Sequence, residues 1–216
     1  MALLAPPVPR LKTHWFRHGD SRGAAQQASA AAFIVWRIAR HALDRTRYAG
    51  YNVDIGAPYF RFLREMLAFL VAVADRIAHA RLAPEQRADF TSAMVLHLAR
   101  ILQDSEDDLV GPAPAGSPSN ADSFIDLVNE LATHYADFGA DPKLPAEPGG
   151  FEPDFAFLRY LGFRLEATVP PEDKRWVQDQ VIACEAPEAV SMLQGSLRDL
   201  FSPPARRARR AGVSGD

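Results

Sequence analysis

The residues of this sequence best suited to chemistry are histidines that follow a carboxylate at a helical spacing. Asp75 precedes His79 by four residues, and Glu130 precedes His134 by the same interval. A separation of four places two side chains on one face of a helix, and metal sites in helical bundles combine carboxylates and imidazoles that project inward. Asp75, His79 and His97 are therefore the candidate ligands of a metal site, and with nearby carboxylates they define one hypothesis, a metal-dependent helical-bundle enzyme.

Helical phase places part of this set on solvated surface. Glu130 lies two residues from the apolar position Val128, which turns it about 160° away from the buried side of its helix, and His134 shares its face. His97 falls on an apolar stripe, where a histidine is more often a hydrogen-bonded core residue than a ligand. The Glu-x-x-His signature of di-iron bundles is missing. We therefore predict no cofactor and no catalytic residues, and keep the metal enzyme as the alternative.

The second candidate site is the connector of residues 47–62, RYAGYNVDIGAPYFRF. Tyrosines with a few polar side chains in a loop are what a small-molecule pocket or a protein interface needs. The candidate ligand-binding or partner-binding residues are Tyr48, Tyr51, Asn52, Asp54 and Tyr59. The other interpretation is an ordered interhelical turn whose tyrosines cover the end of the core.

A third motif lies near the N-terminus, in the octet THWFRHGD. Its Arg17-His18-Gly19 resembles the tripeptide on which histidine phosphatases carry their phosphate-accepting imidazole. The resemblance implies a β-strand before the tripeptide and a second histidine late in the chain. The sequence continues instead with Asp20-Ser21-Arg22 and contains no later His-Gly. It therefore favours an arm in which Trp15 and Phe16 pack on the helices.

Composition narrows the class of partner. The formal net charge of −3 gives no reason to expect a specific nucleic acid or an anionic membrane. The basic tail at residues 206–210 is interpreted as a solubilising terminus. An acidic run at residues 104–108 falls where a helix should end, so it lies past that helix or meets arginines, and solvated surface is expected. Only three of the 24 basic residues are lysines, which suggests a GC-rich bacterial genome.

Cysteine content and hydropathy bear on the compartment. The single cysteine, Cys184, excludes an intramolecular disulfide and any multi-cysteine metal centre, and a reducing cytoplasm fits. The N-terminus lacks the features of a signal peptide. The longest apolar run, Met66 to Ala74, is far shorter than the roughly 20 residues of a membrane span. We expect a soluble cytoplasmic protein.

Helical periodicity dominates the elements that must position these residues. Long helices are predicted at about residues 24–48, 58–81, 84 to the acidic run, and 121–138, followed by shorter ones at 153–166, 171–184 and 187–201, most opened by a proline. The second helix is apolar all round over residues 66–74 and should be central. The predicted fold is all-α, an antiparallel bundle of four long helices with two or three shorter C-terminal helices packed on it.

The predicted organisation is an N-terminal arm (1–20), a single helical domain (21–201) and a disordered basic tail (202–216). Within the domain, the bundle covers 21–139, a linker 140–152 and the shorter helices 153–201. Extra apolar faces on the first two helices suggest a homodimer. The leading hypothesis is a non-enzymatic protein that binds a partner protein or a small ligand through the 47–62 connector.

Overall fold

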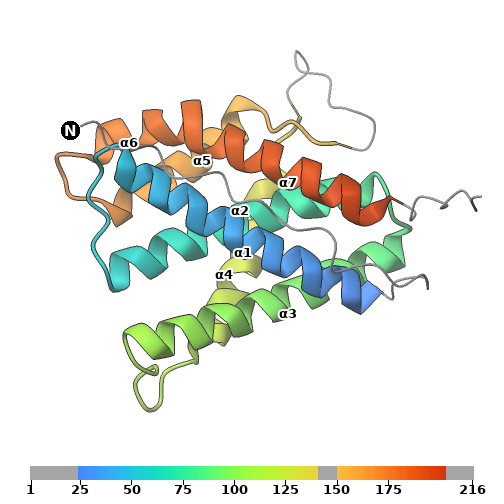
Figure 1. Ribbon diagram of the computed structural model, residues 1–216, viewed down its shortest axis with the longest axis horizontal. Helices are drawn as coiled ribbons and strands as arrows, with labels where there is room; N and C mark the ends of the chain where they lie inside the picture. The colour runs from blue at the N-terminus through green and yellow to red at the C-terminus, as the bar shows by residue number, and fades with distance from the viewer. Residues whose placement is uncertain (1–23, 141–149, 203–216) are drawn as a thin grey trace, which may run out of the picture.

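The structure is a computed structural model that describes residues 24–140 and 150–202 of the 216-residue chain (Figure 1). The predicted all-α fold is confirmed, because the described residues form helices and contain no β-strand beyond one isolated bridge between Ala140 and Pro153. The helices in chain order are α1 (Ala24–Tyr48), α2 (Ala57–His79), α3 (Pro84–Leu109), α4 (Asn120–Ala136), α5 (Phe155–Leu165), η2 (Glu166–Thr168), α6 (Lys174–Gln180), η3 (Val181–Glu185) and α7 (Ala186–Phe201).

Helix α2 is the centre of the molecule, as its sequence predicts. It begins where Gly56 adopts a φ of 115° and Pro58 follows in the first turn. Every residue of α2 from Glu65 to Val71 is buried. The helix packs against α1, α3, α4, α5 and α7. A helix without a polar face must be covered on all sides, and these neighbours cover it.

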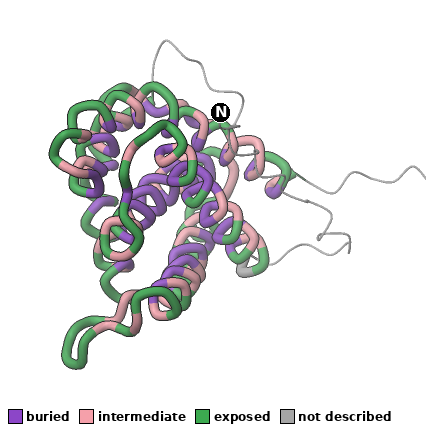
Figure 2. Tube along the Cα trace, turned by 60° about the vertical axis from the view of Figure 1, so that its left-hand side comes forward, coloured by how far each residue is buried: buried purple, intermediate pink, exposed green. Residues whose placement is uncertain are grey.

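The C-terminal helix α7 packs directly on the two first helices of the bundle. Helix α1 packs on α3 and on α7, whereas α4 packs on α2 and α3 (Figure 1). The C-terminal helix α7 also lies against α2, so it belongs to the bundle itself. Figure 2 shows that buried residues follow the inner sides of the helices, while the loop between α3 and α4 is largely exposed.

The C-terminal helices are continuous where a break is predicted. The sequence suggests separate helices ending at residue 184 and starting at Pro187, but α6 continues through the π-helical turn η3 into α7. The N–H of Ala186 bonds to the carbonyl of Val181, five residues earlier. A proline lacks the N–H of a regular helix and clashes with the carbonyl four residues before it, so the wider π turn lets the helix pass Pro187.

The acidic run is partly buried, which corrects the expectation of solvated surface. Helix α3 extends to Leu109 and includes the whole run. Glu106 is buried, and its Oε2 accepts a hydrogen bond of 2.6 Å from Nη2 of Arg64 on α2. The pKa of Glu106 is raised, chiefly by burial and also by Asp107, although the nearby Arg64 lowers it. The run therefore helps to join α2 and α3.

Several predictions concern segments outside the described residues. They are the N-terminal arm with Arg17-His18-Gly19 and the clasp of Trp15 and Phe16, residues 141–149 of the predicted linker, and the basic tail after Ser202. The last part of the linker is described: Phe151 is buried, and the side chain of Gln194 bonds to both its N–H and its carbonyl. This segment is thereby attached to α7.

Candidate functional site

The candidate site is a groove between α2, α3 and α4, with a volume of about 620 Å³. Residues of all three helices line it at helical spacings, so each helix presents one stripe. Helix α2 forms one side with Ala68, Val71, Ala72, Asp75 and Arg76; α3 contributes Arg87, Thr91, Ser92, Val95 and Leu96, and α4 contributes Ile125, Val128, Asn129, Ala132, Tyr135 and Ala136. We call it the α2/α3/α4 groove.

The groove changes character along its length. On α3 the lining begins with Arg87 and Thr91 and continues with Val95 one turn later. On α2, which runs in the opposite direction (Figure 1), Val71 precedes Asp75. Charged and hydroxyl groups of the two helices therefore meet at one end, and most of the other lining residues are aliphatic, interspersed with Ser92, Asn129 and Tyr135. Leu96, which is 50% exposed, adds an apolar side chain at the edge of the groove.

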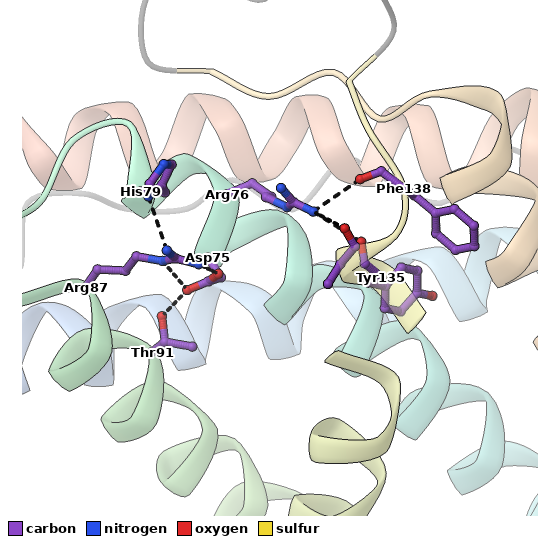
Figure 3. A network of polar contacts seen from close by, with 8 residues as sticks. Asp75, Arg76, His79, Arg87, Thr91, Tyr135 and Phe138 are labelled. Atoms are coloured by element: carbon purple, nitrogen blue, oxygen red, sulfur yellow. Dashed lines mark hydrogen bonds and ion pairs between the residues drawn. The ribbon is translucent and has the colours of Figure 1, made fainter. Parts of the chain in front are cut away.

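The polar end is a hydrogen-bonded network of Asp75, Arg87 and Thr91 (Figure 3). Arg87 forms a bidentate pair with Asp75: its Nε lies 2.9 Å from Oδ1 and its Nη2 bonds to Oδ2. The Thr91 hydroxyl donates to the same Oδ1 at 2.9 Å, and Nη1 of Arg87 lies 3.2 Å from Nδ1 of His79. The hydrogen bond to Asp75 raises the pKa of Arg87 in spite of its burial. The charges at this end are thus paired with each other.

Arg76 fixes the neighbouring end of α4. Its Nη2 donates to the backbone carbonyls of Tyr135, Ala136 and Phe138 at 3.2 to 3.3 Å (Figure 3). The last carbonyls of a helix lack intrahelical partners and carry partial negative charge, which a cation stabilises. Arg76 therefore holds α4 against α2 at the groove.

The predicted metal ligands are only partly brought together. Asp75 and His79 both contact Arg87, whereas His97 does not line the groove. In the part of the chain that the structure describes, no three histidine, cysteine or acidic side chains are grouped as a metal ion would require. Glu130 and His134 are exposed on α4, as their helical phase predicts.

The predicted connector residues lie outside the α2/α3/α4 groove. The Tyr51 hydroxyl donates to the carbonyl of Trp176 at 2.9 Å, and the N–H of Asn52 donates to Oδ2 of Asp173 at 3.5 Å. Burial, together with Asp173, raises the pKa of Tyr51. Both residues therefore attach the connector to the start of α6.

The other connector residues divide between packing and exposure. Tyr59 packs edge-on against Phe60, with ring centroids 5.0 Å apart, beneath the guanidinium of Arg47. Tyr48 and Asp54 are exposed. These contacts favour the interpretation of the connector as an ordered turn.

Sequence reasoning missed the residues of α3 and α4 that line the groove. Arg87, Thr91 and Val95 follow each other at intervals of four, beside the core stripe of the same helix. That second stripe is the signal that could have identified them. A helix with one stripe on the core and a second stripe beside it faces either another helix or a cleft with the second stripe.

Comparison with protein-family models, with curated proteins and with solved structures gave no match. No helix in the described ranges is long and apolar enough to cross a membrane. Function is therefore inferred from the geometry of the groove.

Proposed function

We propose that this chain is a non-enzymatic binding protein whose α2/α3/α4 groove takes a small molecule with an apolar body and a neutral, hydrogen-bonding head. The observation that carries the proposal is the groove itself, with a mainly apolar lining and the network of Asp75, Arg87 and Thr91 at one end. Its volume of about 620 Å³ lies within the roughly 300–1,000 Å³ of small-molecule sites.

The pairing of charges supports a neutral head. A carboxylate or phosphate at the polar end would lie beside the Asp75 carboxylate, whose negative charge repels it, while the charge of Arg87 is already balanced by the bidentate pair. A hydroxyl or amide could use the N–H groups of Arg87 that Asp75 leaves over, without displacing that carboxylate. The same pairing supports binding in place of catalysis, since the carboxylate of Asp75 is occupied by two donors.

Binding can be tested with N-phenyl-1-naphthylamine, a neutral apolar fluorophore. We expect saturable fluorescence enhancement and displacement by 1-naphthol. Naphthalene should displace the probe about two- to tenfold less well than 1-naphthol, since one net hydrogen bond contributes about 0.5–1.5 kcal/mol.

Two variants assign the binding to the groove. Ala132→Phe places a ring in the groove from an exposed position of α4. It should lower the affinity for the probe at least about tenfold, because the ring fills space that the probe needs. Ala88→Phe makes the same change at an exposed position of α3 outside the groove and should bind like the parent. Equal binding by the two variants, or no saturable binding by the parent, would refute the proposal.

The original suggestion of a protein partner or homodimer, and a cytoplasmic location, stay predictions. If Ala132→Phe binds the probe as tightly as the parent, the probe does not occupy the groove, and a protein partner becomes the hypothesis to test there. Sedimentation of the purified chain tests the homodimer directly.

A further inference from the structure

Two further hollows lie along α5 and α6, and none of the residues that line them lines the α2/α3/α4 groove. One, of about 270 Å³, is lined by Arg61, Glu65, Phe163, Arg164, Glu166, Ala167 and Lys174. We call it the cationic pocket. The other, of about 310 Å³, is lined by Phe138, Phe155, Ala156, Arg159, Tyr160, Phe163 and Gln178, and we call it the aromatic pocket. Phe163 borders both pockets, so they adjoin along its ring.

The floor of the cationic pocket is a buried ion pair. Arg164 on α5 donates from Nε and Nη2 to the two carboxylate oxygens of Glu65 on α2, at 2.9 and 2.7 Å. The Glu65 side chain is only 8% exposed. Because the pair is bidentate and enclosed, it fixes α5 on α2 and contributes no net charge to the pocket.

Two cations of the cationic pocket have no counter-ion among the residues that the structure describes. Arg61 and Lys174 are exposed, and within the described residues neither forms an ion pair or a hydrogen bond. The only unpaired carboxylate in the lining is that of Glu166. The pocket therefore has an excess of positive charge, which favours an anion.

The ring between the pockets is unusually accessible. Phe163 is 60% exposed and Phe155, two turns earlier on α5, is 63% exposed. Exposed aromatic side chains beside a cleft are typical of binding surfaces. The backbones beneath them are held close: a Cβ on Gly162 would lie 2.9 Å from Cγ of Gln178 on α6. The two hollows are thus formed by packed helices, and their lining is already in place.

We propose that the two pockets form one site for an aromatic phosphate, with the phosphate between Arg61 and Lys174 and the ring on Phe163. An aromatic ring covers the exposed phenylalanine by stacking, while lysine and arginine are the usual partners of phosphate. Mononucleotides and smaller aryl phosphates share this chemistry. The site is separate from the α2/α3/α4 groove and does not depend on its function.

The test is titration calorimetry of the whole chain with AMP, phenyl phosphate, adenosine and inorganic phosphate. We expect AMP or phenyl phosphate to bind at least about tenfold tighter than inorganic phosphate and than adenosine, since only the aromatic phosphates gain both stacking and charge-assisted hydrogen bonds. Tighter binding of AMP would assign the site to nucleotides, and tighter binding of phenyl phosphate to smaller aryl phosphates.

Variants separate the two halves of the site. Arg61→Gln and Lys174→Gln should each lower the affinity for the aromatic phosphate about fivefold. The control variant Arg100→Gln, at an exposed position of α3, should leave that affinity unchanged. Phe163→Leu should remove most of the preference for aromatic phosphates over inorganic phosphate. The affinity for inorganic phosphate itself should stay unchanged. Equal affinity for all phosphates, equal binding by the Lys174 and Arg100 variants, or no binding at millimolar concentration would overturn the proposal.

Discussion

The buried pair of Glu65 and Arg164 gives the sharpest prediction for stability. Arg164→Ala removes both donors of the bidentate interaction and leaves the Glu65 carboxylate, 8% exposed, without its cation. Removing one member of a buried pair costs about 3–5 kcal/mol. The Arg164 side chain is 25% exposed, so we expect the lower end, about 3 kcal/mol. At about 2–4 °C per kcal/mol for a chain of this size, the melting temperature should fall by roughly 6–12 °C.

The assay is thermal and urea unfolding followed by circular dichroism at 222 nm. The double variant Glu65→Leu with Arg164→Met should recover most of the stability, since apolar residues of similar volume can replace a buried pair. Arg159→Ala, at an exposed position of the same helix, should change stability by less than about 0.5 kcal/mol. A loss below about 1 kcal/mol for Arg164→Ala would refute the assignment of a structural ion pair.

Three further predictions address packing, pH and metal. Gly162→Ala should destabilise the protein by about 1 kcal/mol, because the new Cβ would lie 2.9 Å from Gln178; Gly195→Ala, with open space around it, should instead stabilise by up to about 1 kcal/mol in urea unfolding. The folded-state pKa of Glu106 is raised by burial in spite of Arg64. The contribution of Glu106 to stability therefore falls as pH rises through that pKa, and the stability of Glu106→Gln relative to the parent should increase from pH 4 to pH 7. A difference between variant and parent that does not change with pH would contradict this. Elemental analysis of chain purified without a histidine tag should find far less than one zinc, iron or manganese per chain, and a stoichiometric metal would favour the metal-enzyme alternative.

The helices were predictable because their signals are local. Pro58 and Pro84 mark the starts of α2 and α3, and the apolar run at 66–74 places α2 at the centre. Each of these signals depends on residues within one or two turns of each other. Pro187 is the exception, since its local rule predicts a helix start and the π turn before it keeps the helix continuous.

The site was not predictable in the same way, because it depends on how three helices are spaced. Asp75 and His79 were identified from their interval, but their partner Arg87 comes from the next helix and neutralises Asp75. The interval places two side chains on one face and says nothing of what that face meets. The burial of Glu106 was missed for the same reason, since Arg64 lies 42 residues earlier in the chain.

The two proposed sites differ because arginine plays different parts in them. At the groove, Arg87 is bidentate with Asp75, which is also bonded to Thr91, so the charge of this arginine is already balanced. An anion there would be repelled by the Asp75 carboxylate, whereas a neutral head would not. At the cationic pocket the pairing of Arg164 with Glu65 fixes the floor, and within residues 24–140 and 150–202 Arg61 has no carboxylate partner. An anion there gains attraction without breaking a protein contact, and for this reason the smaller pocket, not the larger groove, is the place for a phosphate.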